Sequence, residues 1–331
     1  MDQQVPIPAR NSRVILALAV TTLFWASAFP VIKSAGVAYG PGQLATLRFT
    51  IAALALGIAA IFKGVRRPRG MQILWFMVTG FTGFSLYHPF LNWGEQTISA
   101  GTAALLINSA PVWTAILAAF VLKEKISLRK ALGIAISFTG ILLLVLGQPI
   151  SSAQAPATTA AVTLAAGTFP AEQVIPSWVA ALIVLTSAVC AAFYVTVQKK
   201  FLHDFNALEF TFWSVLAGVV QLWPIFGIST AQTVLHAPLQ HTLEITYLGI
   251  FPAAIAYMAF AYATVRMPAS RVMTVMYITP PITMLIACAY PDQREWPKLL
   301  SIIGGLLAIA GVAVVNTAKK ELEPVKAIEE G

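Results

Sequence analysis

Charged residues are scarce in this sequence. Of its 331 residues, 21 are Lys or Arg and 13 are Asp or Glu, so only 10% carry a charge, compared with about 25% in soluble globular domains. Hydrophobic residues make up 58%, and the mean hydropathy is +0.78. A chain of this length suggests two soluble domains, but it has too few ionic side chains to cover their surfaces. The composition therefore predicts that lipid surrounds most of the chain.

Cysteine and several functional motifs are also lacking. Cys190 and Cys288 both lie in apolar runs, and two cysteines exclude a disulfide framework and a four-thiolate metal site. Gly-rich phosphate loops, zinc-ligand spacings and nucleophile elbows are not evident. The net charge of +8 does not indicate nucleic-acid binding, because the basic residues form short clusters between apolar runs rather than one basic face. We therefore expect no enzyme, cofactor, metal or nucleic-acid partner.

Long apolar segments are what the sequence has instead. A membrane-crossing helix needs about 20 mostly apolar residues, and ten segments meet this requirement. The sequence therefore predicts an all-α integral membrane protein with ten transmembrane helices, whose partners are the bilayer and a small-molecule substrate; monomer and homodimer both stay open. The predicted spans are 14–35, 42–62, 72–93, 100–122, 128–147, 178–198, 205–228, 243–263, 270–290 and 299–317.

The Lys and Arg residues set the predicted orientation. Seventeen of the 21 fall in segments on the same side of the membrane as the N-terminus; the exceptions are Lys33, Arg48, Arg294 and Lys298. Because basic residues concentrate in cytoplasmic loops, both termini are predicted to be cytoplasmic, including a tail over 318–331.

An external linker is predicted to divide the chain. Residues 148–177 contain no Lys or Arg and are rich in Ala, Thr, Ser and Pro, a composition typical of a flexible segment. It separates two groups of five spans, 14–147 and 178–317.

The two groups look like copies of one another. At an offset of 170, Phe81 aligns with Phe251 and Tyr87 with Tyr257. Further matches are Pro111 with Pro281, Ile116 with Ile286, Ala119 with Ala289, Gly133-x6-Gly140 with Gly304-x6-Gly311, and, at an offset of 165, Phe29 with Tyr194. Because five is odd, equivalent helices would cross the membrane in opposite directions. Such inverted repeats are typical of secondary transporters, which bind substrate near the midplane between the repeats.

Several short motifs carry a resemblance to a known family. They are Phe24–Pro30, Leu47-Arg48-Phe49, Ala103–Leu106 with Ser109–Val112 and Glu124, and the weaker second copy Thr279–Ile282. Over about 14–317, the chain resembles the ten-span EamA-type family of the drug/metabolite transporter superfamily. The resemblance implies two inverted five-helix repeats in the bacterial inner membrane and a substrate class of amino acids or similar small metabolites, usually exported. Ala289–Asp292 departs from the Glu-containing ending usual in that family.

Polar residues inside the spans are the candidates for substrate contact, because such groups usually face a bundle interior or a water-filled cavity. In span three, Ser85, His88, Asn92 and Gln96 recur at helical spacing. His88 and Asn92 are predicted either to line a cavity or to bond between helices. Asn108 in span four suits the ammonium and carboxylate of a zwitterion, or it caps the carbonyl that Pro111 leaves unpaired.

Aromatic and proline positions add further candidates. Thr274 and Tyr277 precede the Pro280-Pro281 pair in span nine, and a broken helix at mid-depth commonly lines a cavity; a purely structural kink is the alternative. Trp25 lies near the centre of span one and is either a core residue or a cavity wall, as are Tyr194 and Tyr257. For Arg48, we favour a structural anchor whose stem reaches the outer surface; the alternative is attraction of a carboxylate.

No Asp or Glu is expected in the interior of a span, because Glu95 and Glu209 lie near span ends. Proton relays generally use intramembrane Asp, Glu or His, so proton antiport of cationic drugs is disfavoured and His88 is the remaining candidate for proton coupling. We therefore expect facilitated export by alternating access. Import, other cargo such as sugars or drugs, a non-transporting receptor and a membrane-embedded enzyme are the alternatives.

Overall fold

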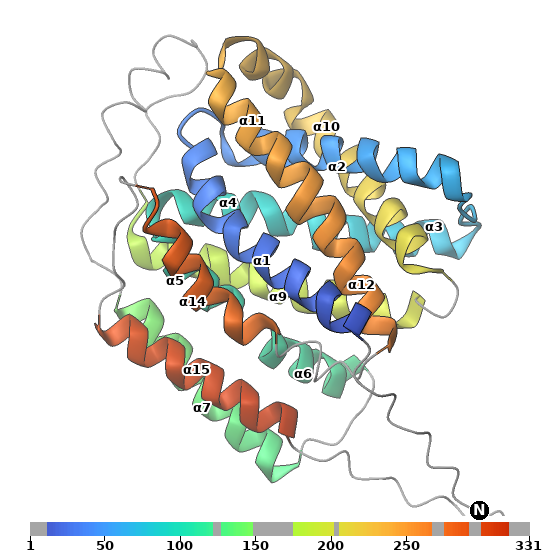
Figure 1. Ribbon diagram of the computed structural model, residues 1–331. Helices are drawn as coiled ribbons and strands as arrows, with labels where there is room; N and C mark the ends of the chain where they lie inside the picture. Colours follow the sequence, from blue (N-terminus) through green and yellow to red (C-terminus); the bar gives the residue numbers. More distant parts are fainter. Residues whose placement is uncertain are drawn as a thin grey trace, which may run out of the picture.

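The computed structural model describes residues 12–121, 127–147, 175–201, 205–266, 275–290 and 299–317. All regular elements in these ranges are helices, as the hydropathy pattern predicts (Figure 1). The predicted linker, 148–177, is described only from residue 175, and the predicted tail, 318–331, lies outside the described residues.

The first half of the chain contains one continuous helical run or broken helix for each of its predicted spans. Side-chain caps start two of these helices: Ser99 accepts a hydrogen bond from the Thr102 amide, and Ser127 accepts one from the Lys130 amide, as N-cap residues commonly do. The elements are α1 (Ser12–Ala35), α2 (Pro41–Lys63), α3 (Met71–Gly80), η1 (Phe81–Leu86), α4 (Tyr87–Thr97), α5 (Ala100–Ile107), α6 (Ala110–Val121) and α7 (Leu128–Leu146).

The second half follows the same sequence of elements. Asn206 and Glu209 form a capping box at the start of α10, which satisfies two backbone amides that the helix leaves free. The elements are α9 (Ser177–Phe201), α10 (Ala207–His236), α11 (Leu239–Leu248), η2 (Gly249–Ile255), α12 (Ala256–Arg266), α14 (Val275–Ala287) and α15 (Leu299–Thr317).

Both halves contain a π-helical turn at the corresponding position. In η1 and η2 the backbone is wound more widely than in an α-helix, and the predicted offset of 170 aligns Phe81 in η1 with Phe251 in η2. Pro89 follows η1 closely and Pro252 lies inside η2; because proline has no amide hydrogen, each interrupts the regular bonding of an α-helix. Such turns are rare and occur frequently at functional sites.

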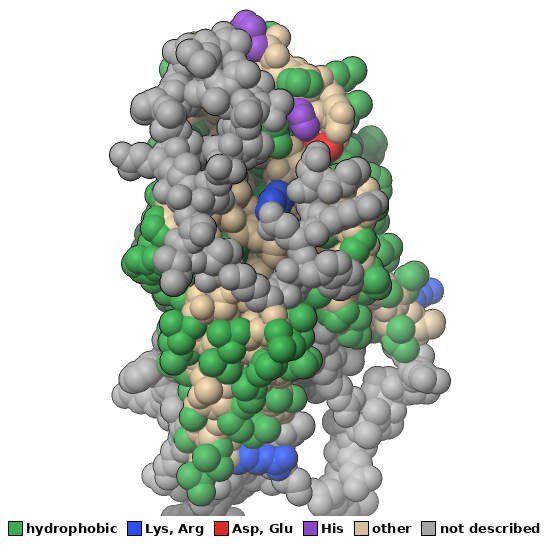
Figure 2. Space-filling view, turned by 90° about the vertical axis from the view of Figure 1, so that its left-hand side faces the viewer, with side chains coloured by type: hydrophobic (Ala, Val, Ile, Leu, Met, Phe, Trp, Pro, Cys, Tyr) green, Lys and Arg blue, Asp and Glu red, His purple; other side chains and the backbone are tan. Residues whose placement is uncertain are grey.

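Six helices or helical runs are individually long and apolar enough to cross a membrane, namely Ser12–Ala35, Pro41–Lys63, Leu128–Leu146, Ser177–Gln198, Ala207–His236 and Leu239–Thr264. Large apolar side chains point outward from them: Ile61, Phe62 and Ile228 are each at least 80% exposed. Figure 2 shows hydrophobic side chains over much of the described surface on one face, with few charged ones. This surface suits lipid rather than water.

The contacts between the halves follow a two-fold pattern. Helix α1 packs against α12 and α14, whereas α9, its counterpart by order, packs against α4 and the α5–α6 pair. Likewise α10 contacts α3 and η1, and α2 contacts their counterparts α11 and η2. Each of these contacts therefore has a counterpart in which the corresponding helices of the two halves are interchanged.

The most extensive contact between the halves, among the described helices, is a glycine seam between α7 and α15, which lie side by side (Figure 1). A side chain on Gly140 would meet the Gly304 carbonyl, and one on Gly311 would meet the Gly133 carbonyl. Because the higher-numbered glycine of one helix faces the lower-numbered glycine of the other, the two helices run antiparallel. Ser137 donates a hydrogen bond to the Ala308 carbonyl across the seam (2.9 Å).

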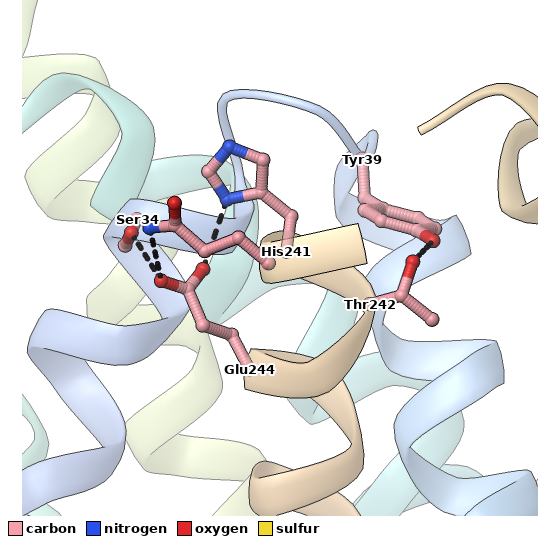
Figure 3. A network of polar contacts seen from close by, with 6 residues as sticks. Ser34, Tyr39, His241, Thr242 and Glu244 are labelled. Atoms are coloured by element: carbon pink, nitrogen blue, oxygen red, sulfur yellow. Dashed lines mark hydrogen bonds and ion pairs between the residues drawn. The ribbon is translucent and has the colours of Figure 1, made fainter. Parts of the chain in front are cut away.

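A polar network ties the end of α1 to the start of α11 (Figure 3). The Ser34 hydroxyl donates to Glu244 Oε1 (2.8 Å), and His241 Nδ1 lies 2.9 Å from Glu244 Oε2. Nearby, the hydroxyls of Tyr39 and Thr242 are 2.6 Å apart. These bonds join the two halves at one end of the bundle.

Candidate functional site

A central cavity lies between the two halves. Its wall comes from both halves of the chain, from α1, α2, η1, α4, α5, α6, α9, α12 and α14. The space open to the centre of a water molecule is about 90 Å³, several times what a single water needs. A cavity of this kind inside a helical bundle is the usual place for a ligand.

Five of the eight candidate residues share this cavity. Trp25, His88, Asn108, Tyr194 and Tyr257 all line it. Asn92 is not part of the lining; it is 2% exposed and donates a hydrogen bond to the Pro41 carbonyl at the start of α2 (3.0 Å). Thr274 lies outside the described residues, as does the side chain of Tyr277. Substrate contact by the eight stays a prediction.

His88 stands at the centre of the aromatic part of the wall. Its Nε2 atom lies 3.2 Å from the Tyr257 hydroxyl, and its ring packs 4.4 Å from the ring of Phe49. The other ring nitrogen, Nδ1, is buried without a hydrogen-bond partner. The side chain can therefore still donate or accept one bond, depending on its tautomer.

Trp25 combines the two roles expected for it. Its indole N–H donates to the Pro252 carbonyl in η2 (3.3 Å), which gives the buried indole the hydrogen-bond acceptor that it needs. Its ring centroid lies 5.3 Å from that of Tyr257 and 5.0 Å from that of Phe260, and all three line the cavity. The residue thus packs between helices and forms part of the wall.

Asn108 lies at the break between α5 and α6. Its amide nitrogen donates to the Ala104 carbonyl one turn earlier (2.7 Å), so it does not cap the carbonyl left by Pro111, which is that of Ile107. Its Oδ1 atom is buried without a hydrogen-bond partner. An unpaired amide oxygen on a cavity wall can accept a hydrogen bond from a ligand.

Arg48 does not act as the surface anchor that the sequence favoured. The side chain is 2% exposed and lines the cavity. Arg48 lies near the start of α2, as predicted, but its side chain points toward the interior of the bundle. Its stem therefore does not lead out to water. The hydroxyls of Tyr87 and Tyr257 lie near enough to Arg48 to interact with it electrostatically.

Two other lining residues were not among the candidates, although the repeat alignment marked both. Tyr87 aligns with Tyr257 and Phe29 with Tyr194, and all four line the cavity. When a cavity lies on the two-fold axis of a repeat, the counterpart of a lining residue tends to line it too. Applying this rule to Tyr194 and Tyr257 would have found both residues.

Glu95 corrects the expectation that no carboxyl group lies inside the bundle. The residue is near the end of α4, as expected, but its side chain is 0% exposed. Neither carboxyl oxygen has a hydrogen-bond partner, and Lys33 and Arg48 are near enough to interact with it electrostatically. A buried carboxyl group therefore lies within reach of Arg48 on the cavity wall, so the small number of acidic residues does not exclude carboxyl-linked proton coupling.

The apolar helices and the central cavity define a multi-pass membrane protein with an internal binding space. The profile of the EamA-like transporter family matches residues 12–146 and 178–317. The chain therefore belongs to the EamA-like transporter family, and it is a transporter rather than an enzyme.

Relatives of known name agree with this assignment. The "Probable terminal-alkyne amino-acid exporter" of Streptantibioticus cattleyicolor is 34% identical, over 92% of this chain and 94% of the relative. The "Uncharacterized transporter YdfC" of Bacillus subtilis is 31% identical, over 92% and 90%. A crystal structure that covers 92% of this chain and 96% of its own has a TM-score of 0.57 at 21% identity, which supports the fold alone.

Proposed function

We propose that this transporter exports amino acids or closely related small metabolites from the cytoplasm by alternating access. In this proposal it lies in the bacterial inner membrane with ten spans, as two inverted five-helix repeats over 14–147 and 178–317 and with both termini cytoplasmic. Helices overlap all ten predicted spans. The antiparallel seam of α7 and α15, which are counterparts in the repeat, supports the inversion.

The main support for the proposed class of substrate is the cavity between the halves. Aromatic rings of Trp25, Tyr194 and Tyr257 form much of its wall, with polar atoms of His88 and Asn108 among them. This combination suits a small molecule with an apolar side chain and a polar head. The name of the Streptantibioticus relative supports both an amino acid and outward movement.

A toxicity-rescue panel tests the cargo and direction. Cells expressing the protein are challenged with toxic amino-acid analogues, including the terminal-alkyne amino acid L-propargylglycine, and with sugar analogues and cationic drugs. Rescue confined to amino acids supports the proposal, whereas rescue from sugars or drugs, or sensitisation by uptake, contradicts it. Substrate counterflow in proteoliposomes separates a transporter from a receptor or an enzyme, since only a transporter exchanges labelled for unlabelled substrate.

Facilitated export driven by the substrate gradient alone is the simplest form of the proposal, and the buried side chains of His88 and Glu95 make proton coupling its alternative. Transport by purified protein in proteoliposomes is measured with no pH gradient and with an imposed one. Equal initial rates support facilitated transport. A strict requirement for the gradient contradicts it, and the variants His88→Ala and Glu95→Gln then show which of the two buried groups binds the proton.

A further inference from the structure

Arg48 is a buried cation that makes no side-chain hydrogen bond or salt bridge to any described residue. The side chain is only 2% exposed, and its buried Nε and Nη1 atoms make no hydrogen bond. The charge lies 5.3 Å from the centre of the adjacent Phe49 ring. Glu95 is near enough for electrostatic attraction, but its two oxygens are unpaired as well, so the two groups do not form a hydrogen-bonded ion pair.

This arrangement is costly unless something else occupies the cavity. A guanidinium keeps its charge at every physiological pH, so it cannot escape burial by losing its proton as a lysine can. An unpaired buried charge is strongly unfavourable, and charged residues in membrane helices generally face a pathway for polar cargo. Because Arg48 lines the cavity, a ligand that enters the cavity can supply the missing anion.

The surroundings of Arg48 select the class of anion. A carboxylate matches the fork of a guanidinium and accepts two parallel hydrogen bonds from it. Arg48 is the single Lys or Arg in the described lining, which balances one negative charge but not the charges of a nucleotide sugar or a phosphate ester. The unpaired Asn108 Oδ1 on the same wall can accept from an ammonium group, and the rings of Trp25 and Phe260 offer an apolar surface.

We propose that Arg48 binds the α-carboxylate of the transported amino acid and selects cargo that carries this group. The inference rests on the proposed function, and it adds a requirement that the function alone does not make. An amino acid whose carboxylate is replaced by a neutral amide keeps its side chain and its ammonium group but loses the partner of Arg48. Such an amide should be a poor substrate.

The test compares acids with their amides in proteoliposomes that contain the purified full-length protein. The probes are L-phenylalanine and L-propargylglycine, each beside its primary amide, with counterflow as the readout. The variants are Arg48→Gln and Arg48→Lys. The matched control is Lys33→Gln, which removes a positive charge that, like Arg48, interacts with Glu95. Lys33 is not part of the cavity lining, and its ammonium is bonded to the Ile98 carbonyl.

We expect the wild type to carry an acid at least about 30-fold faster than its amide, the factor that corresponds to losing one partner of a buried charge pair. The rate of acid counterflow should fall by a similar factor in Arg48→Gln. Arg48→Lys should retain part of this rate, because it keeps the positive charge but not the fork of the guanidinium. Lys33→Gln should transport the acid at close to the wild-type rate. Acid-dependent thermal stabilisation of the purified protein should follow the same order.

Three outcomes are distinguishable. Equal transport of acid and amide by the wild type overturns the role of Arg48, and it does so even where Arg48→Gln fails to fold. A folded Arg48→Gln variant that still prefers acids overturns it too; in both cases amino-acid transport, and hence the proposed function, stands. If the wild type carries none of the amino acids, the proposed function fails and the role of Arg48 fails with it.

Discussion

The seam between α7 and α15 and the wall of the central cavity use buried polar groups in opposite ways. At the seam, the fully buried hydroxyl of Ser137 is bonded across the interface, and no described residue of α7 or α15 has a buried polar side-chain atom without a partner. On the cavity wall, Arg48, His88 and Asn108 each keep at least one such atom.

The backbone differs between the two regions in the same way. Helix α7 runs without interruption from Leu128 to Leu146, whereas the cavity is bordered by the π-helical turn η1 and by the break at Asn108 and Ser109. Regular helices allow the close approach that glycine permits in membrane bundles. Irregular helices, in contrast, turn backbone carbonyls and side chains toward the cavity that they border. The contrast suggests that the seam holds the halves together while the cavity wall retains unpaired groups for cargo.

A methyl group at the seam should give the largest effect on stability. In Gly140→Ala, the new Cβ would lie 2.5 Å from the Gly304 carbonyl oxygen and 2.8 Å from Ala308 Cα, so α7 and α15 must move apart. We expect a loss of about 1–3 kcal/mol, as for other overpacked sites, measured by unfolding of the detergent-purified protein.

Gly57→Ala is the matched control for this change. Its Cβ would lie 3.5 Å from Phe212 Cε2, an ordinary contact, and alanine is favoured over glycine in helices by up to about 1 kcal/mol. A Gly140→Ala protein as stable as Gly57→Ala would show that the seam is not tightly packed.

On the cavity wall, the main effect should fall on transport. Asn108→Ala removes the unpaired Oδ1 atom, and a hydrogen bond to a charged ligand group contributes about 1.5–3 kcal/mol. We therefore expect amino-acid counterflow to fall at least about tenfold, with a loss of stability below that of Gly140→Ala. Preserved transport with a lower melting temperature would instead make Asn108 a structural residue.

A milder change on the same wall is Tyr257→Phe. It removes the hydroxyl beside His88 Nε2 while keeping the ring contacts with Trp25 and Phe84. One neutral hydrogen bond contributes about 0.5–1.5 kcal/mol, so transport should fall about two- to tenfold. An unchanged rate would exclude the hydroxyl from cargo handling.

The smallest effect is expected from Ser137→Ala at the seam. The variant loses one interhelical bond to the Ala308 carbonyl, and such bonds average about 0.6 kcal/mol in a membrane bundle. Stability should fall by about this amount, and counterflow should stay at the wild-type rate. A loss of transport with a normal melting temperature would remove the distinction between seam and cavity wall.

Helix positions followed from the sequence more readily than side-chain directions did. Hydropathy placed helices over the predicted spans because burial in lipid depends on composition alone. The helical spacing that grouped Ser85 with His88 assumed a uniform α-helix, whereas η1 changes the phase of the turns, and Ser85 bonds to the Gly218 carbonyl on α10 instead. The inward rotation of Arg48 and the burial of Glu95 depend on neighbouring helices, which a single helix does not specify.

The crossed glycine pairs of the seam, Gly133 with Gly311 and Gly140 with Gly304, also bear on the history of the gene. Two copies of one five-helix protein, inserted in opposite orientations, would form the same contacts, since each copy would present one surface to itself. Duplication and fusion of such a gene would therefore create a ten-helix chain without inventing an interface. After fusion, either half could diverge alone, and the cavity could become asymmetric, with Arg48 contributed by one half only.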